Sequence, residues 1–374
     1  MIRSGRPPCV VQLLPALDSG GVERSTLEIA AALTAAGQRA VVVSAGGRLL
    51  PQLLATGAEH VRLDIGRKSP LTLRHARTLR RLFAQADIVH ARSRLPAWIG
   101  WLALRGMPSG ARPRFVTTVH GLNSPSRYSA ILTRGQRVIC VSETVRAHVL
   151  GNYPEVDPGK LVVIPRGVDP KAFPRVDGVD RQARLAWARR YPELGGDGPL
   201  LLLPGRGTRL KGHADAIDLL AALQGDGVDA RLWLPGAVQT GRARYLAELE
   251  AHAKARGVRS KLALTVATAE MPDAYAAADL VLQLSRKPEA FGRTMVESLC
   301  VGRPVLGWAH GGVGELLAQL QPEGAVAPFD AGALARRAHA LLHNPPPPPA
   351  TMPYSLQAMQ ETTLAVYRSL GALD

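Results

Sequence analysis

Residues 285–315 read SRKPEAFGRTMVESLCVGRPVLGWAHGGVGE, and the rest of the chain is best understood from this stretch. Phe291-Gly292-Arg293-Thr294 is typical of a tight turn that opens a helix, which we expect over residues 294–300. A short apolar strand over 304–308 and a second glycine turn at 311–314 follow. Glycine at a helix start lets an anion approach the first free amides. The stretch therefore predicts strands, turns and helices in alternation, with an anion site at the first turn.

Two glutamates flank that turn, Glu289 before it and Glu297 within the helix, with seven residues between them. Glu297 lies one turn into the expected helix, so it faces the same ligand as the turn, where a carboxylate accepts hydrogen bonds from hydroxyl groups. Two carboxylates at one ligand indicate recognition of a polyol. The alternative is an ordinary strand, turn and surface helix, because two glutamates at this spacing also occur by chance.

The ordered combination of motifs is more specific than the spacing of the glutamates. It comprises Glu289, Phe291-Gly292, Glu297, Gly302-Arg303-Pro304 and Gly311-Gly312. This block resembles the E-x7-E block of the retaining GT-B glycosyltransferases of family 4, also called group 1. The resemblance implies an α/β fold of the GT-B type, in which two doubly wound Rossmann-like domains face each other across a cleft. It also implies a hexosyltransferase that moves a sugar, with retention, from a nucleoside-diphosphate sugar to a hydroxyl of a saccharide acceptor, as in lipopolysaccharide or other cell-surface glycan synthesis.

The length of the chain fits two domains. A chain of 374 residues suits two domains of about 170 residues each. Residues 165–169, PRGVD, follow a predicted strand and resemble the family's I-P-x-G-V-D hinge. We therefore expect an acceptor-binding domain over 1–166 and a donor-binding domain over 167–349. The five prolines at 345–349 predict a stiff spacer, and the resemblance implies that a helix within about 350–374 packs back onto the first domain.

The loops of the first domain supply further candidates. Gly20-Gly21-Val22-Glu23-Arg24 resembles the family's GGxER element, which implies that Gly20 and Gly21 approach the donor, although a glycine pair before a helix is also a common turn. Arg92 and Arg94 follow a predicted strand at its carboxyl end, where open α/β sheets bind ligands, and are candidates for acceptor contacts. His120 follows another strand, and the resemblance implies that it lies beside the reacting sugar and supports the transition state.

The first loop of the second domain, residues 204–212, reads PGRGTRLKG and has neither the G-K-[ST] ending of a Walker A loop nor a G-x-G-x-x-G pattern. It resembles the family's G-R-x(n)-K-G loop, which implies that Arg206 and Lys211 hold the donor diphosphate. The departing diphosphate gains negative charge, so preset cations stabilise the transition state more than the ground state. No D-x-D pair occurs in the chain, and we expect no metal or other cofactor.

The resemblance also assigns the residues of the opening stretch. Glu297 is expected on the ribose and Glu289 on the sugar hydroxyls, while the amides near Gly292, Arg293 and Thr294 are expected on the sugar and phosphate. The family often has a glycine and a basic residue near the nucleobase after the strand that ends at 266. This chain has Ala267-Thr268-Ala269-Glu270 there, so the base and the sugar stay unassigned.

The positive charge is concentrated in the first half of the chain. The formal net charge is +16, and residues 1–165 hold 22 Lys plus Arg against 9 Asp plus Glu, whereas residues 166–374 hold 24 against 21. A coding bias explains why only seven of the 46 basic residues are Lys, but not why the excess lies in one domain. Such a field attracts a phosphorylated saccharide, an anionic membrane surface or nucleic acid. The arginine-rich helix expected over 69–83 is either a solvated face or a docking surface.

The apolar runs predict a protein without a membrane span. None approaches the roughly 20 residues that a span needs, and Pro15 and Asp18 interrupt the first run, which does not resemble a signal peptide. We therefore expect a cytoplasmic protein, with peripheral association at the inner face of the membrane as a further expectation. Cys9, Cys140 and Cys300 lie in apolar settings without C-x-x-C spacing, which is typical of buried free thiols.

Three other functions stay open at this point. A nucleotide-sugar epimerase of GT-B-like fold would convert the donor without any acceptor. A nucleic-acid-binding protein would use the same basic charge, although the chain has no zinc finger, helix-turn-helix or aromatic-interleaved RNA motif. A catalytically inactive scaffold is the third, although both glutamates, the Arg/Lys pair and His120 are present.

Overall fold

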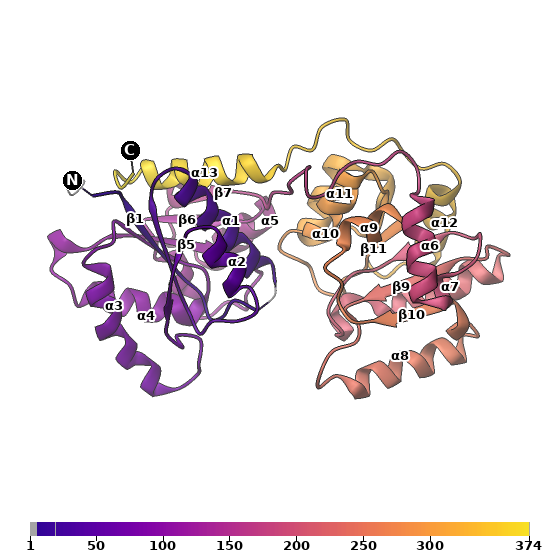
Figure 1. Ribbon diagram of the computed structural model, residues 1–374, viewed down its shortest axis with the longest axis horizontal. Helices are drawn as coiled ribbons and strands as arrows, with labels where there is room; N and C mark the ends of the chain where they lie inside the picture. Colours follow the sequence, from indigo (N-terminus) through magenta and orange to yellow (C-terminus); the bar gives the residue numbers. More distant parts are fainter. Residues whose placement is uncertain (1–5, 19, 374) are drawn as a thin grey trace. The chain divides into compact units, whose positions relative to one another are not determined.

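The computed structural model describes residues 6–18 and 20–373 (Figure 1). The chain divides into two compact units, one made of the residues up to Gly167 together with those from Leu356 onward, the other of Val168–Ser355. The structure divides the chain after Gly167, where the sequence predicted a boundary after residue 166. It divides the chain again after Ser355, where a return was expected at about residue 350. Each unit has a sheet and a hydrophobic core of its own.

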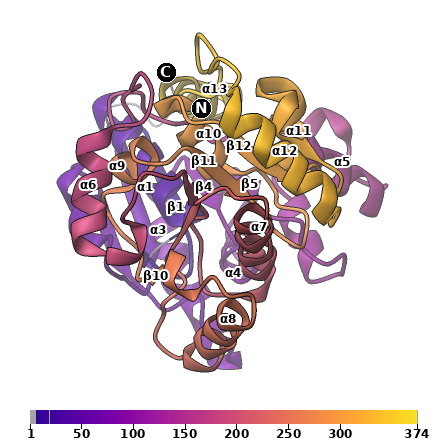
Figure 2. The same cartoon turned by 90° about the vertical axis from the view of Figure 1, so that its right-hand side faces the viewer.

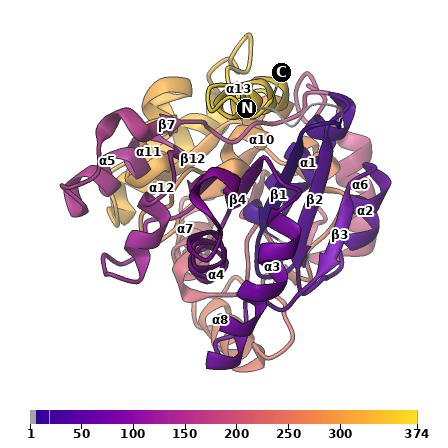
Figure 3. The ribbon, with the colours of Figure 1, turned by 90° about the vertical axis from the view of Figure 1, so that its left-hand side faces the viewer.

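The sheet of the first unit has seven parallel strands in the order β3-β2-β1-β4-β5-β6-β7. Figure 3 shows β1, β2 and β3 side by side. Apolar runs such as VVV at residues 41–43 are buried completely, as expected for strands covered on both faces. The strands are β1 Cys9–Leu13, β2 Arg39–Ser44, β3 Glu59–Arg62, β4 Ile88–Ala91, β5 Arg114–Val119, β6 Arg137–Cys140 and β7 Leu161–Val163.

Helices cover both faces of this sheet, and one of them comes from the end of the chain. α13 lies beside α1, where Gln360 Nε2 donates to the carbonyl of Glu28 at 2.8 Å (Figure 1). Its buried side chains, among them Leu364 and Tyr367, join the core of the first unit. The helices are α1 Gly21–Ala35, α2 Leu50–Ala55, α3 His75–Phe83, α4 Arg94–Arg105, α5 Glu143–Asn152 and α13 Leu356–Arg368, with 3-10 turns η1 Pro70–Arg74, η2 Ser109–Ala111, η3 Ser129–Thr133 and η4 Pro158–Lys160.

The sheet of the second unit has six parallel strands in the order β10-β9-β8-β11-β12-β13. The chain order reverses between β8 and β11, as it does between β1 and β4 in the first unit, so both sheets are doubly wound and the predicted α/β class is confirmed. The strands are β8 Leu200–Leu202, β9 Arg231–Pro235, β10 Leu262–Thr265, β11 Leu280–Gln283, β12 Val305–Trp308 and β13 Ala325–Val326.

Seven α-helices belong to the described part of this second unit, and α7 and α12 lie side by side (Figure 2). They are α6 Arg181–Arg190, α7 His213–Gly225, α8 Ala243–Ala255, α9 Met271–Ala276, α10 Arg293–Val301, α11 Gly311–Leu320 and α12 Ala331–His343. The 3-10 turns are η5 Pro192–Leu194, η6 Arg209–Lys211, η7 Arg259–Lys261 and η8 Pro322–Gly324. The prolines at 345–349 form neither helix nor strand.

The helix predicted over 69–83 is wrong in one respect, since it consists of η1 followed by α3. Ser69 caps the first turn, accepting from the amide of Leu71 at 3.3 Å, and Pro70 follows as expected, but the turn has 3-10 hydrogen bonding. As a result Leu71 and Leu73 are 66% and 50% exposed. No helix in the described part of the chain is long and apolar enough to cross a membrane.

Candidate functional site

The loop between β8 and α7 places Lys211 at the carboxyl end of the second sheet. Gly212, at φ +73°, begins α7, and a Cβ at this position would lie 1.9 Å from the carbonyl oxygen of Leu284. Only glycine allows this approach, which lays the loop directly against the end of β11. Because β8 and β11 are the strands at which the sheet order reverses, Lys211 lies where open α/β sheets bind ligands.

Lys211 and Glu289 form an ion pair, with Nζ and Oε1 2.6 Å apart and the two side chains 26% and 24% exposed. Ser285 Oγ donates to the same carboxylate oxygen. The backbone of Glu289 is fixed as well, because its carbonyl accepts from the amide of Gly312 at 2.7 Å. A Cβ on Gly312 would lie 2.5 Å from the carbonyl oxygen of Ala290, so the second glycine turn is needed for this contact. The structure thus brings together two of the residues that the sequence singled out.

α10 begins at the predicted anion site. Gly292 precedes it at φ +122°, a region that favours glycine, and no side chain caps the helix. The first amides of an α-helix have no acceptor within the helix, so those of Arg293 and Thr294 point toward the turn. Thr294 is held by Gln283 on β11, whose Nε2 donates to Thr294 Oγ1 at 3.1 Å. The turn is thus fixed to β11, and the binding of an anion at its amides stays a prediction.

Glu297 has different surroundings from Glu289. It is 5% exposed, and its two oxygens accept hydrogen bonds from Tyr275 Oη at 3.0 Å and from Arg293 Nε at 3.1 Å. The carboxylate is therefore paired within α9 and α10 in this structure. Its contact with a ribose stays a prediction.

Arg206 is exposed, and its side chain makes no hydrogen bond or ion pair with any other described residue. Gly207 beside it packs closely, since a Cβ there would lie 2.2 Å from the carbonyl oxygen of Ala237. The loop is thus fixed while the guanidinium is available to a ligand.

Sequence reasoning missed three neighbours of the Lys211–Glu289 pair: Ser285, His310 and Arg286. His310 Nε2 donates to the carbonyl of Ser285 at 2.8 Å, and Arg286 forms an ion pair with Asp215 on α7 at 2.7 Å. Arg286 also stacks over the ring of Phe329, 4.9 Å from its centroid. Polar residues that directly follow β11 and β12 were a usable signal, because the carboxyl ends of neighbouring parallel strands meet at one edge.

In the first unit, His120 follows β5 and contacts Arg166, which follows β7. Arg166 Nη2 donates to His120 Nδ1 at 2.8 Å. His120 Nε2 is buried and has no hydrogen-bond partner among the described residues. Burial, followed by the charges of Arg166 and Arg92, holds the pKa of His120 well below its usual range. The ring is therefore neutral near pH 7.

Arg92 and Arg94 lie at the end of β4 but in unlike settings. Arg92 is 2% exposed, and its Nε and Nη1 donate to Gln12 Oε1 at 2.8 Å and to Ser25 Oγ at 3.3 Å. This guanidinium ties the end of β4 to β1 and α1, while its Nη2 is buried without a hydrogen-bond partner among the described residues. Arg94 is half-buried, donates to Ser129 Oγ at 3.2 Å and lies over the ring of Tyr128. Of the two predicted contacts, Arg94 is the more accessible.

Gly20 and Gly21 begin α1. Gly20 has φ +150°, and a Cβ there would lie 2.5 Å from Glu23 Oε2, whereas Gly21 has open space around it. Both conformations fit the predicted close approach of a ligand, which stays a prediction.

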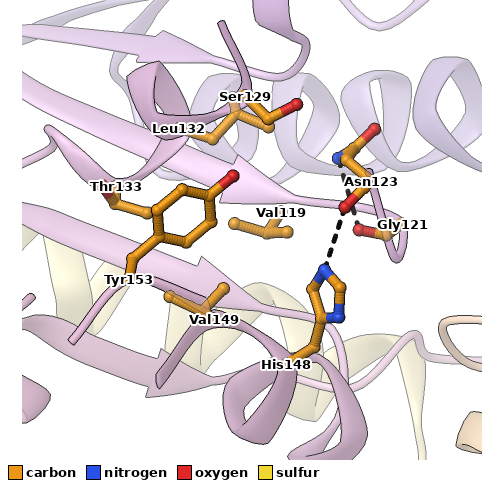
Figure 4. Close-up of a pocket in the computed structure, with 9 residues that line it drawn as sticks. All are labelled: Val119, Gly121, Asn123, Ser129, Leu132, Thr133, His148, Val149 and Tyr153. Carbon is orange, nitrogen blue, oxygen red and sulfur yellow. Dashed lines mark hydrogen bonds between the residues drawn. The ribbon is translucent and has the colours of Figure 1, made fainter. Parts of the chain in front are cut away.

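A small pocket in the first unit is lined by Val119 and Gly121, the residues on either side of His120 in the chain (Figure 4). Its wall includes Gly121 and Asn123 from the loop after β5 and His148 from α5. His148 Nε2 donates to the carbonyl of Asn123 at 3.0 Å, and Asn123 Nδ2 donates to the carbonyl of Gly121 at 3.3 Å. These bonds hold the loop that carries His120, and no motif in the sequence indicated them.

Clusters suited to a metal are absent from residues 6–18 and 20–373, where no three His, Cys, Asp or Glu side chains are arranged around one point. Cys9, Cys140 and Cys300 are buried free thiols, and burial raises the pKa of each.

Comparison with known proteins supplies the context for these residues. The family model described as Glycosyltransferase Family 4 matches residues 19–172, and the one described as Glycosyl transferases group 1 matches residues 188–355. The mannosylfructose-phosphate synthase of Agrobacterium fabrum is 29% identical over 192 residues, which are 50% of this chain and 41% of that relative. The chain thus matches less than half the length of this relative.

Two solved structures extend the likeness to nearly the whole chain. A glycosyltransferase from Rickettsia africae is 26% identical, with a TM-score of 0.81 over 98% of this chain and 99% of that one. HepE from Anabaena, solved with UDP and glucose, is 19% identical, with a TM-score of 0.81 over 96% of this chain and 99% of that one. The second likeness concerns the fold alone.

Proposed function

We propose a function for this chain from its family: it belongs to the family 4, group 1 glycosyltransferases and has their GT-B fold. On that premise, the protein transfers a sugar from a nucleoside-diphosphate sugar to a hydroxyl of a saccharide acceptor. The observation that carries this proposal is the Lys211–Glu289 pair at the switch point of the second sheet. Lys211 can bind a phosphate, Glu289 can accept hydrogen bonds from sugar hydroxyls, and the two side chains are in contact. The unit of Val168–Ser355 is then the donor-binding part, and the first unit is the acceptor-binding part.

The contact between Lys211 and Glu289 suggests how the donor is received. A diphosphate near Lys211 and Arg206 would compete with Glu289 for the ammonium group, and the released carboxylate could then accept hydrogen bonds from sugar hydroxyls. Ser285, which donates to Glu289, would keep that carboxylate in place. As the sugar leaves, the diphosphate gains charge that the two cations stabilise, and we propose that they do so without a metal ion. Retention at the anomeric carbon is proposed on the family resemblance.

A donor-binding experiment tests this function. Thermal unfolding with UDP-, GDP-, ADP- and TDP-sugars should show one class that stabilises the protein, by about 2.7 kcal/mol at a hundred times its dissociation constant. Lys211→Ala should abolish the shift, whereas Arg74→Ala on the exposed end of η1 should keep it. No shift with any donor, or an equal loss in both variants, would refute the assignment.

Product analysis separates the function from its rival. Transfer to an added saccharide, unchanged in EDTA, supports a glycosyltransferase that works without a metal. Conversion of the donor sugar to an epimer without any acceptor would support the isomerase instead.

We further propose that the acceptor is lipid-linked, as in lipopolysaccharide-type glycans, and that η1 and α3 dock on an anionic membrane surface at the cytoplasmic face. The exposed side chains of Leu71 and Leu73 stand among cations that form no ion pair in the described part of the chain. These are Lys68, Arg74, Arg77 and Arg81. Apolar side chains ringed by unpaired cations suit an interface of anionic headgroups.

Vesicle sedimentation tests the docking surface. At low salt the protein should sediment with vesicles containing anionic lipid and not with zwitterionic ones, because each basic residue near the surface contributes about 1 kcal/mol. The double variant Leu71→Ser/Leu73→Ser should bind more weakly, and Leu185→Ser, an exposed leucine of the other unit, should not. Retention by neither vesicle would remove the membrane from the proposal.

A further inference from the structure

The contact between Arg166 and His120 fixes the chemical state of one ring nitrogen. A guanidinium group has only donors, so the nitrogen that receives its N–H must be an unprotonated acceptor. Arg166 Nη2 lies 2.8 Å from His120 Nδ1. In the neutral ring the proton is therefore on Nε2.

The position of Arg166 is itself well defined. Arg166 is 7% exposed, and its Nη1 contacts Met359 Sδ of α13 at 3.9 Å. The amide of Gly167 donates to the same sulfur at 3.5 Å. The guanidinium is thus held between the end of β7 and the returning helix. Arg166 occupies the variable place in the motif I-P-x-G-V-D, so the resemblance to the family assigned it no role.

The other nitrogen of the ring is an unused donor. His120 Nε2 is buried and has no hydrogen-bond partner in the described ranges. Buried polar groups without partners are rare in folded proteins. Ser93 Oγ, after the neighbouring strand β4, is also buried without a partner among these residues. Arg92 Nη2, at the same end of β4, is a third such atom. Three unused polar atoms at the carboxyl ends of adjacent strands indicate a place for a polar ligand.

We propose that Arg166 is a positioning residue, which holds His120 as a neutral imidazole whose Nε2–H donates a hydrogen bond to a hydroxyl oxygen of the transferred sugar. This inference rests on the proposed function for the identity of the ligand, but not for the state of the ring. The lone pair of Nδ1 is occupied by Arg166 and Nε2 carries the proton, so the ring cannot accept a proton in this state. His120 is thereby assigned as a hydrogen-bond donor and not as a general base.

The charges around the ring support the neutral state. The groups that face it are Arg166 from the end of β7 and His90 and Arg92 from the end of β4, and none of them is a carboxylate. Burial and these cations disfavour an imidazolium, and they lower the pKa of His120 accordingly. His120 as a residue is half-buried, so we expect a sugar oxygen to reach Nε2 from the solvent side of the loop after β5.

Nitrogen NMR of the full-length protein, with ¹⁵N-labelled histidine and no ligand, reads the state of the ring directly. His120→Gln identifies the signals. In the wild type we expect an Nε2–H tautomer that does not titrate between pH 7.5 and 5.5. In Arg166→Met, which keeps the length of the side chain and removes its donors, we expect a mixture of tautomers and a pKa closer to the ordinary value.

Two further variants complete the test. Arg166→Lys still donates and should restore the Nε2–H tautomer, and Arg114→Met, at the exposed opposite end of β5, should leave it unchanged. An Nδ1–H tautomer in the wild type would overturn the proposal, even if Arg166→Met does not fold. An unchanged tautomer in a folded Arg166→Met variant would also overturn it.

Kinetics with the donor found by thermal shift tests the contact with the sugar. Arg166→Met should lower kcat about tenfold with little change in KM for the donor, because one oriented hydrogen bond to the sugar is lost. Its rate should also fall as the pH drops below about 6.5, where the wild-type rate stays level. A rate equal to that of the wild type would refute the sugar contact. Absence of transfer with every donor, together with the expected tautomers, would refute the proposed function and leave the positioning by Arg166 intact.

Discussion

At the scale of single residues, the two glutamates of the E-x7-E block differ in what surrounds them. Glu289 is partly exposed, and its Oε1 contacts both Lys211 Nζ and Ser285 Oγ. Glu297 is buried, and its carboxylate accepts hydrogen bonds from Tyr275 and Arg293. The spacing of the pair could be read from the sequence, and the resemblance assigned both Lys211 and Glu289 to the donor, but their ion pair was not predicted. The burial of Glu297 could not, because it depends on Tyr275 from another helix.

We expect this difference to appear in stability. Glu297→Ala leaves Arg293 and Tyr275 without their shared acceptor in a buried setting, and should lower the free energy of unfolding by about 3 kcal/mol. Glu289→Ala removes a partly exposed pair and should cost less than about 1 kcal/mol. Urea unfolding measures both, with Glu323→Ala, an exposed and unpaired glutamate, as the control. Similar decreases in the free energy of unfolding for Glu289→Ala and Glu297→Ala would contradict the conclusion that only Glu297 is buried with its partners.

At the scale of elements, α13 is attached to the first sheet by a buried chain of polar contacts. His90 on β4 contacts Tyr367 Oη of α13 at 2.7 Å through Nδ1 and Thr118 Oγ1 of β5 at 2.6 Å through Nε2. Burial raises the pKa of Tyr367 to about 12, so its hydroxyl keeps its proton. The apolar pattern predicted a final amphipathic helix, but amphipathicity does not say which surface such a helix covers. The surface that α13 covers is determined by the contact of Tyr367 with His90, which lies 277 residues earlier in the chain.

The same contacts make the first unit sensitive to acid. Burial, Arg92 and Arg166 hold the pKa of His90 well below its usual range, and His120 behaves alike. Below about pH 6.5 the unfolded chain therefore binds protons that the folded unit does not, so stability is full above that pH and falls as the pH decreases. Each histidine should contribute a loss of up to about 1.4 kcal/mol per pH unit.

Urea unfolding between pH 7.5 and 5 measures this loss. Tyr367→Phe should lower stability by about 1–2 kcal/mol already at pH 7.5, because it removes a partner of His90. Stability that does not depend on pH in this range would show that His90 and His120 are protonated equally in both states.

At the scale of the whole molecule, the chain builds two cores that share no residue. One contains Leu201, Leu232 and Leu282 of the second sheet, the other Val10, Ile88 and Leu364 of the first unit. Length and the hinge motif predicted two domains, and the resemblance to the family implied that each has a doubly wound sheet. Short elements such as α2 and β3 escaped prediction because they are partly exposed and have no periodicity long enough to recognise.

Two cores with separate ligands should melt as two separable steps. In differential scanning calorimetry we expect two transitions, and the nucleotide sugar selected by thermal shift should raise the one that belongs to Val168–Ser355 more than the other, because Lys211, Arg206 and Glu289 all lie in that unit and His120 is the donor contact proposed from the first. About 2.7 kcal/mol at a hundredfold excess over the dissociation constant corresponds to roughly 5–10 °C for a unit of this size. Tyr367→Phe should lower only the other transition, which identifies it independently of any ligand. If the donor raised chiefly the transition that Tyr367→Phe lowers, the donor would not be held mainly by the second unit. If both transitions always moved together, the two units would unfold as one.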